Sequence, residues 1–426
     1  MNRTTLLGGL LIALLAAPAA AEDGTPPLSP SDPDELARTA LAGNPALAAL
    51  DQRLVAARAA AEPAGALPGP MVETMLQNVG LDRLTIGDEE MSMLTVELRQ
   101  SLPSARKRAA RRGAAAAEEA LVAAEARVRR REILVEIREA WATLYAIDAE
   151  RTALDAAAEL LELLAQVTAD RYSTGSTDLE SAVRARLEGS RLVEREIDLD
   201  AARSLVVARL ERLVDAPGGL AIPPVEALPP VAFPADGWPA EAVREAAPVA
   251  AARVAIDAAE RRAVAAREEL RPDLSVGGGA GYRGSFDPVV IVRFGVEWPA
   301  WTRDTQRPRV AAAEAEAQAA RDDLRAAEFE ARAAAARAGA LRAQAERQLV
   351  RVREGSLPLA TAALDAARAA YVAGRGEFSA VVEDVKAWLE ARVLVSRREA
   401  ELYAAWAAIR ALVPSAEDRA LLGETP

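Results

Sequence analysis

The sequence RYSTG at residues 171–175 has a second, related copy, AYVAG, at residues 370–374, and the rest of the chain repeats around these two segments. Earlier landmarks repeat at nearly the same separation: Pro45 pairs with Pro248, and Pro103 pairs with Pro299. A unit of about two hundred residues is too long for a solenoid, whose repeats are roughly 20 to 50 residues. The chain is therefore predicted to be a duplicated half-molecule.

Residues 1–21 are predicted to be a secretory signal peptide. Arg3 provides a basic start, residues 6–17 form an apolar stretch too short to span a bilayer, and Ala19-Ala20-Ala21 offers a cleavage site. The mature chain would begin near Glu22 and would contain no other run of about 18 apolar residues. We therefore expect an exported protein without a transmembrane helix.

The composition excludes several kinds of function. A net charge of -12 argues against nucleic-acid binding, which needs a basic surface. The chain has neither histidine nor cysteine, which excludes Ser-His-Asp and Cys-His catalysis and leaves carboxylates as the expected metal ligands. Carboxylate pairs are present but fit charged helix faces, so no catalytic residue, metal or cofactor is expected.

A very long amphipathic helix is predicted over residues 104–171, which contain no proline and one glycine. At 1.5 Å per residue it would be on the order of 100 Å long. Its apolar residues recur at steps of three, four or seven: Ile133, Ile137, Trp141, Leu144, Ile147, Leu154, Leu161 and Leu164. Residues 178–214 are predicted to return beside it as an antiparallel partner, offering Leu179, Val183, Leu187, Val193, Ile197 and Leu205.

The second repeat copies this hairpin over residues 308–371 and 377–412. Pro358 lies inside its long helix, where a proline removes a backbone hydrogen bond and bends the axis. A kink is therefore expected near residues 355–358. Taken alone, the helices would also fit an ordinary coiled coil.

Two alternating segments predict β-strands. Met93, Thr95, Glu97, Arg99 and Ser101 share one face of residues 91–102, while Leu94, Val96, Leu98, Gln100 and Leu102 share the other. Residues 289–299 alternate similarly, and residues 71–79 and 273–283 are the expected partners. Strands of about ten residues suit a tilted span of a membrane. Because two isolated hairpins would leave free edges, the strands are predicted to join those of other copies.

These elements divide the chain into a signal peptide (1–21), a first repeat (22–215), a proline-rich linker (216–239), a second repeat (240–413) and a C-terminal tail (414–426). The hairpin tips are expected near residues 172–178 and 371–377. The linker's prolines forbid a helix and predict an extended strap at mid-height. The polar tail is predicted to be loosely held.

Aromatic residues near the second strand pair predict either an uneven membrane girdle or simple core packing: Tyr282, Phe286, Phe294, Trp298 and Trp301.

The chain resembles the TolC-like outer membrane efflux proteins, the outer membrane factor family, over essentially its whole mature length. The resemblance rests on three kinds of segment: NPAL at residues 44–47; SLP at 101–103 with the basic RKR at 106–108; and the two tips, RYSTG and AYVAG. A single glycine-terminated tip would be weak evidence, since glycine commonly ends helices. Two tips in register within a duplicated chain are specific.

The resemblance implies a mainly α fold with a small membrane β-barrel portion. Duplicated long antiparallel α-hairpins would form an α-helical tunnel, and four strands per chain would enter a 12-stranded barrel shared by a homotrimer. It implies an exit duct in the outer membrane, in contact with lipid, that serves a tripartite efflux or type I secretion system. A periplasmic adaptor and an inner-membrane efflux pump or ABC exporter would be its partners. The alternative is a periplasmic coiled-coil adaptor or scaffold.

The resemblance also implies that the tips close the periplasmic end of the tunnel and meet the adaptor. The residues implied there are Tyr172, Gly175, Asp178, Leu179, Tyr371, Gly374 and Phe378. Read without the family, Gly175 and Gly374 suit a left-handed turn and Asp178 suits a helix cap, so these residues would also serve simply to reverse the chain.

The family's acidic constriction aligns with Ala380 and Glu383, so only one of its two positions is acidic here, with Asp384 beside it. A single ring of Glu383 side chains would favour cations. An ordinary solvated helix face is the alternative interpretation of these carboxylates.

Overall fold

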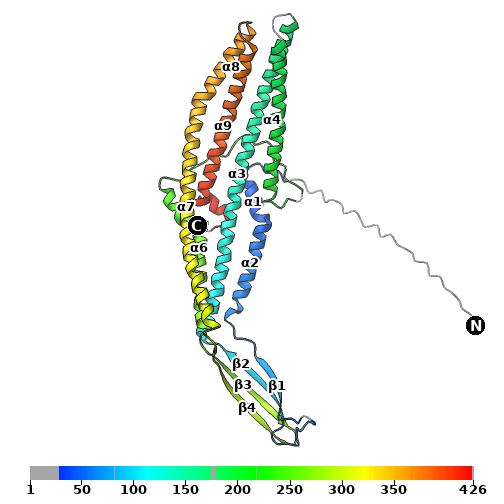
Figure 1. Ribbon diagram of the computed structural model, residues 1–426, viewed down its shortest axis with the longest axis vertical. Coiled ribbons are helices and arrows are strands. Elements are labelled where there is room, and N and C mark those ends of the chain that lie inside the picture. The colour runs from blue at the N-terminus through cyan, green and yellow to red at the C-terminus, as the bar shows by residue number, and fades with distance from the viewer. Residues whose placement is uncertain (1–27, 81, 174–178, 217, 425–426) are drawn as a thin grey trace, which may run out of the picture.

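The computed structural model describes residues 28–80, 82–173, 179–216 and 218–424. The predicted signal peptide, Gly175 and Asp178 lie outside the described residues. The described chain is an elongated helical bundle with a β-sheet at one end and two helical tips at the other (Figure 1). The sheet and the helical tips therefore lie at opposite ends of the bundle, separated by the length of the helices.

The first repeat runs from the middle of the bundle to the sheet, then to a tip and back. Its elements are α1 (Pro33–Gly43), α2 (Pro45–Ala61), the short 3-10 helix η1 (Pro63–Gly65), β1 (Met71–Gln77), β2 (Met93–Leu102), α3 (Ala105–Ser173) and α4 (Leu179–Glu211). Asn44 lies between α1 and α2 and caps the start of α2, because its side-chain oxygen accepts hydrogen bonds from the Ala46 and Leu47 N–H groups. The same side chain donates to the Leu213 carbonyl at 2.9 Å, so one cap also anchors the end of α4.

The second repeat follows the same path. Its elements are α5 (Trp238–Glu245), α6 (Ala247–Glu268), β3 (Asp273–Arg283), β4 (Phe286–Glu297), α7 (Gln306–Arg351), the π-helical turn η2 (Val352–Ser356), α8 (Leu357–Val372) and α9 (Phe378–Leu412), with α10 (Ala416–Leu422) after it. The π turn ends directly before the helix that begins Leu357-Pro358, the place where the sequence predicts a kink. A single π-helical turn inside a long helix is a recognised cause of bending.

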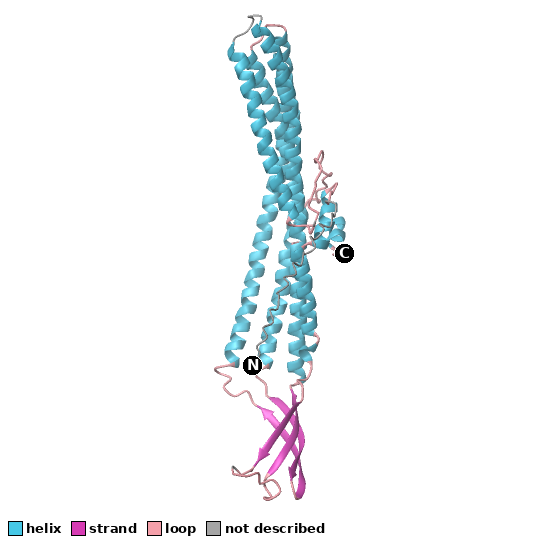
Figure 2. Ribbon diagram, turned by 90° about the vertical axis from the view of Figure 1, so that its right-hand side faces the viewer, coloured by secondary structure: helices cyan, strands magenta, loops and turns pink. Residues whose placement is uncertain are grey.

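The long helix α3 forms the axis to which the other helices are fitted. At 69 residues it is far longer than the average helix of about 11 to 12 residues, and it therefore needs partners along its whole length. It packs against α2 and α6 toward the sheet, and against α4 and α9 toward the tips (Figures 1 and 2). Its predicted apolar positions Ile133, Ile137 and Leu144 are fully buried.

Helix α4 forms beside α3, but the sequence pattern misplaced its buried face. Val193, Ile197 and Leu205 are 56%, 63% and 73% exposed, whereas Leu199 and Leu210 are buried. Val183 and Leu187 are exposed as well. The prediction that this apolar stripe covers α3 is wrong, because α4 turns other side chains toward α3 and leaves the stripe outside.

The four strands form one antiparallel sheet in the order β1-β2-β3-β4, so the two repeats join through β2 and β3. Odd-numbered residues pair with odd-numbered residues across β1 to β3 and along most of β4, as in Thr95 opposite Gly281 and Gly277 opposite Arg293. One face of the sheet is therefore odd-numbered and the other even-numbered. The mainly helical fold, with four strands among the described residues, agrees with the predicted fold class.

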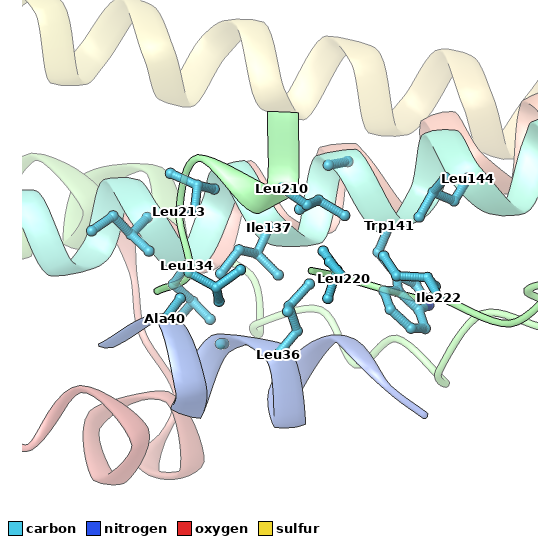
Figure 3. Close-up of a cluster of buried hydrophobic side chains, with 14 of the residues drawn as sticks. Leu36, Ala40, Leu134, Ile137, Trp141, Leu144, Leu210, Leu213, Leu220 and Ile222 are labelled. Atoms are coloured by element: carbon cyan, nitrogen blue, oxygen red, sulfur yellow. The ribbon is translucent and has the colours of Figure 1, made fainter. Parts of the chain in front are cut away.

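The largest core lies at mid-height, where α1, α3, the end of α4 and the linker meet (Figure 3). Leu36 and Ala40 of α1 face Leu134, Ile137 and Trp141 of α3. The linker is extended, and its buried residues Leu220, Ile222 and Val225 complete the cluster. Apolar burial of this kind stabilises by about 25 cal/mol per Å², and it fixes the linker on the helices.

Polar contacts hold the linker at defined points. Asp148 of α3 accepts from the Val225 N–H at 2.9 Å and from the Arg203 guanidinium at 2.8 Å. Farther along the linker, the Trp406 indole of α9 donates to the Ala232 carbonyl at 3.1 Å. The proline-rich segment thus connects the two helical hairpins at mid-height.

The C-terminal tail is a docked helix, and the prediction that it is loosely held is wrong. Ser415 and Asp418 form a capping box at the start of α10. Asp418 is buried against Arg138 of α3 at 2.7 Å, and Glu424 pairs with Arg131 of α3 at 2.6 Å. The charges that hold α10 lie almost three hundred residues earlier in the sequence, so the local polarity of the tail did not reveal them.

Candidate docking tips and channel constriction

The second tip is a compact, buried turn. Tyr371 is 2% exposed, and its ring meets Phe378 edge-on with 5.8 Å between centroids. Its hydroxyl lies 2.6 Å from the Thr168 hydroxyl of α3. The Arg171 guanidinium lies 4.6 Å from the centre of the Tyr371 ring and donates to the Tyr371 carbonyl at 2.7 Å. The Arg171 guanidinium also donates to the Val372 carbonyl at 3.1 Å, so stacking and three hydrogen bonds hold the end of α3 against the second hairpin.

The reversal at this tip depends on Gly374. Its φ of 76° is left-handed, its N–H donates to the Tyr371 carbonyl at 3.0 Å, and the Arg375 N–H donates to the Ala370 carbonyl at 3.0 Å. These bonds satisfy carbonyl groups at the end of α8 in the manner of a Schellman turn. A Cβ at Gly374 would meet no atom within 4 Å, so the requirement for glycine comes from the backbone conformation.

Gly374→Ala is expected to lower the free energy of unfolding by about 1 to 2 kcal/mol, the cost of a left-handed L-residue. Denaturant unfolding followed by circular dichroism measures this change. Gly355→Ala is the matched control, because Gly355 is helical and its Cβ would meet only the Arg351 side chain at 4.0 Å. Equal losses in the two variants would contradict the role of the left-handed turn.

The first tip differs from the second. Tyr172 is 48% exposed, although it corresponds in sequence to the buried Tyr371. Leu179 begins α4. The two halves of the duplication therefore place equivalent tyrosines in different surroundings, one in the core of the tips and one on their surface.

The predicted constriction residues lie near the start of α9. The Glu383 side chain is 74% exposed and lies 3.5 Å from Lys386, while Asp384 is partly buried. Lys386 also pairs with the nearly buried Glu188 of α4 at 3.0 Å. The sequence reasoning missed Lys386, although its position three residues after Glu383 is the spacing that brings helix side chains together.

A second carboxylate links three helices farther from the tips. Glu150 of α3 is 9% exposed in its side chain and is paired with Arg195 of α4 and, at 2.9 Å, with Arg397 of α9. A nearly buried carboxylate needs such partners, since an unpaired buried charge is costly. No sequence motif marked Glu150, because its partners lie 45 and 247 residues away.

The even-numbered face of the sheet is strongly apolar and exposed. Phe294 on this face is 81% exposed, and Trp298 and Trp301, which follow β4, are 71% and 80% exposed, so these rings do not pack into a core of this chain. Aliphatic side chains continue the surface: Val72, Leu76, Val96, Leu98, Leu274, Val276, Val290, Val292 and Val296. An apolar face of this size with interfacial aromatics is typical of a sheet that contacts lipid.

No described helix combines the length and apolarity needed to cross a membrane. Within the same part of the chain, no group of three or more acidic, histidine or cysteine side chains is placed to bind a metal ion.

The second repeat matches a known family, and most of the chain resembles solved structures. Residues 238–414 match the family model for outer membrane efflux proteins. The outer-membrane channel OprN is 19% identical, with 89% of each chain covered and a TM-score of 0.76. VceC from Vibrio cholerae is 19% identical, with 89% of this chain and 95% of that chain covered and a TM-score of 0.73. CusC is 15% identical, with coverages of 89% and 92% and a TM-score of 0.75. No curated protein sequence matches the chain.

The chain thus shares the fold of the outer-membrane channel OprN and of VceC, and the predicted fold class is confirmed. The family match over residues 238–414 and the shared fold both agree with the resemblance to outer membrane efflux proteins.

Proposed function

We propose that this protein is an efflux duct of the outer membrane. Three copies of the chain would form one duct, with β4 of each copy pairing with β1 of the next. The observation that carries the proposal is the sheet itself. Within the described residues, β1 and β4 each have a strand on one side only, and exposed strand edges are a liability that closure into a barrel removes. Three sheets of four strands would make the 12-stranded barrel.

The exposed stripe on α4 supports the same assembly. Val193, Ile197 and Leu205 form part of an apolar face that no other helix of the chain covers among the described residues. A second copy packed along α4 would bury this stripe and extend the barrel into a closed helical tunnel. The face that does not fit a single chain therefore fits a homotrimer.

The duct itself would be passive. An inner-membrane efflux pump or ABC exporter would supply the energy, and a periplasmic adaptor would bind the tips. The proposed docking residues are Tyr172, Gly175, Asp178, Leu179, Tyr371, Gly374 and Phe378. Exposed Tyr172 would contact the adaptor, while buried Tyr371 and Phe378 would shape the tip from within.

We assign the channel constriction to Glu383 and Asp384 as part of the same proposal. Three copies of the exposed Glu383 would form a ring that favours cations. Lys386 lies beside each Glu383, so the ring would be weaker than one made of unpaired carboxylates. Acidic side chains at both positions of the family motif would select cations more strongly.

Fractionation of cells and the mass in mild detergent test the assembly. The mature protein is expected in the outer membrane, to need detergent for extraction, and to have the mass of three protomers. Val292→Lys should reduce assembly, because a lysine on the lipid face of a barrel costs about 2 to 4 kcal/mol at mid-membrane. Ile291→Lys is the matched control, since it lies on the opposite, odd-numbered face beside the Glu97 row.

A salt-extractable monomer or dimer would overturn the proposal and return the protein to the class of periplasmic coiled coils. Equal loss of the trimer in both lysine variants would show that the even-numbered face does not contact lipid.

A further inference from the structure

The odd-numbered face of the sheet carries a connected set of charged side chains. Arg99 of β2 pairs with Glu73 of β1 at 2.5 Å, and Arg293 of β4 pairs with Glu97 of β2 at 2.7 Å. Glu73 and Glu97 are directly opposite each other in the ladder. The four side chains therefore form one band across the sheet, named here the charge belt.

Glycines in β3 allow this band to cross a whole strand. Gly277 lies between Arg99 and Arg293 in the strand register, so no side chain separates β2 from β4 at this level. At Gly279, a Cβ would lie 2.3 Å from the Val96 carbonyl oxygen and 2.8 Å from Cγ of Glu97. The Arg293 guanidinium thus passes over β3 to reach a carboxylate two strands away.

The charges of the belt are unequally exposed. The Glu97 side chain is 5% exposed, whereas the side chains of Glu73, Arg99 and Arg293 are 44%, 39% and 48% exposed. The belt thus holds two acids and two bases, but two guanidinium groups and only one carboxylate are well exposed. Because the even-numbered face is apolar, the odd-numbered face is the one that would line water in a closed barrel.

We propose that the charge belt sets the charge selectivity of the barrel lumen, at the opposite end of the duct from Glu383. This inference rests on the proposed trimeric duct. Rings of charged side chains determine which ions pass through a pore. A belt with paired charges passes solutes of either sign, and the exposed Arg99 and Arg293 offer contacts to anionic groups on them. Removal of one member of a pair leaves its partner's charge unbalanced in each of three copies.

The test is the reversal potential of purified protein in planar bilayers under a potassium chloride gradient. Arg293→Gln should shift the reversal potential toward cation selectivity, and Glu97→Gln should shift it toward anion selectivity. The double variant Glu97→Gln/Arg293→Gln should return it close to the unmodified value. Opposite shifts from two bonded residues are the signature of a lumen charge, because a purely structural pair would disturb the pore similarly from either side.

Assembly and selectivity are measured separately. The mass of each variant in detergent reports whether the trimer forms, and the Arg99→Gln and Glu73→Gln pair repeats the test at more exposed positions if loss of buried Glu97 prevents assembly. An unmodified protein that forms no channel would overturn the duct itself. A conducting protein whose reversal potential stays unchanged in the variants, or shifts in the same direction in both members of a pair, would overturn the charge belt alone.

Discussion

Arg138→Ala is expected to lower the free energy of unfolding by about 3 to 5 kcal/mol, the range found when one partner of a buried ion pair is removed. Arg138 and Asp418 have side chains only 4% and 3% exposed and meet at 2.7 Å. Arg138 also pairs with Asp34 of α1 at 3.0 Å and lies 4.7 Å from the centre of the Trp406 ring. The variant would leave Asp418 buried without its cation and would remove the Arg138 ion pairs to α1 and α10.

Denaturant unfolding followed by circular dichroism measures the loss, and Arg321→Ala is its control. Arg321 pairs with Glu260 at a similar 2.7 Å, but both side chains are about half exposed, and exposed pairs contribute about 0.2 to 1 kcal/mol. The double variant Arg138→Met/Asp418→Asn should recover part of the loss, because it leaves no buried charge unpaired. A loss in Arg138→Ala no larger than in Arg321→Ala would refute the anchoring role.

The same pair gives the sign of an acid dependence. Burial raises the pKa of the Asp418 carboxyl, but the Arg138 charge and the hydrogen bonds from Ser415 together outweigh burial, so the pKa is lowered from its ordinary value. A lowered pKa in the folded state contributes stability that is complete above the unfolded pKa of about 3.9 and is lost as pH falls through the folded value. Unfolding measured below about pH 4 should therefore depend less on pH in Asp418→Asn than in the unmodified protein.

Tyr371→Ala is expected to cost about 3 to 5 kcal/mol, the range for truncating a large aromatic side chain in a core. The variant would remove the edge contact to Phe378, the bond to Thr168 and the ring on which Arg171 stacks. Hydrogen exchange at the amides of residues 364–385 measures the local effect, which should be faster exchange at the second tip. Tyr371→Phe should lose only the hydroxyl bond, about 1 kcal/mol.

Tyr172→Ala is the matched control from the other copy of the motif. Tyr172 is half exposed, and substitutions at such surface positions usually change stability by no more than about 0.5 kcal/mol. Tyr172→Ala should instead weaken binding of the proposed adaptor while the fold is kept. Similar destabilisation in both alanine variants would contradict the different surroundings of the two tyrosines.

Local sequence determined the secondary structure and much of the fold class. The spacing of Ile133, Ile137 and Leu144 on a proline-free segment specifies a helix, because a period of 3.6 residues is a property of neighbouring positions. Alternation between Val96 and Glu97 specifies a strand with one apolar and one polar face for the same reason. The duplication visible in RYSTG and AYVAG predicted that the architecture would occur twice.

Only the tertiary structure decided which faces meet. The sequence pattern of α4 predicted an apolar stripe, but it did not predict that Val193 and Ile197 point away from α3. An amphipathic pattern shows which face of a helix is apolar and does not identify the partner that covers it. Buried Tyr371 and exposed Tyr172 carry the same local signal and differ only in what packs on them. The docking of α10 through Arg138 and Asp418, and the belt that joins Arg293 to Glu97 across β3, depend on residues 280 and 196 positions apart. Such pairs form because folding brings charges that are far apart in the sequence within contact distance. Local sequence patterns carry no information about these contacts.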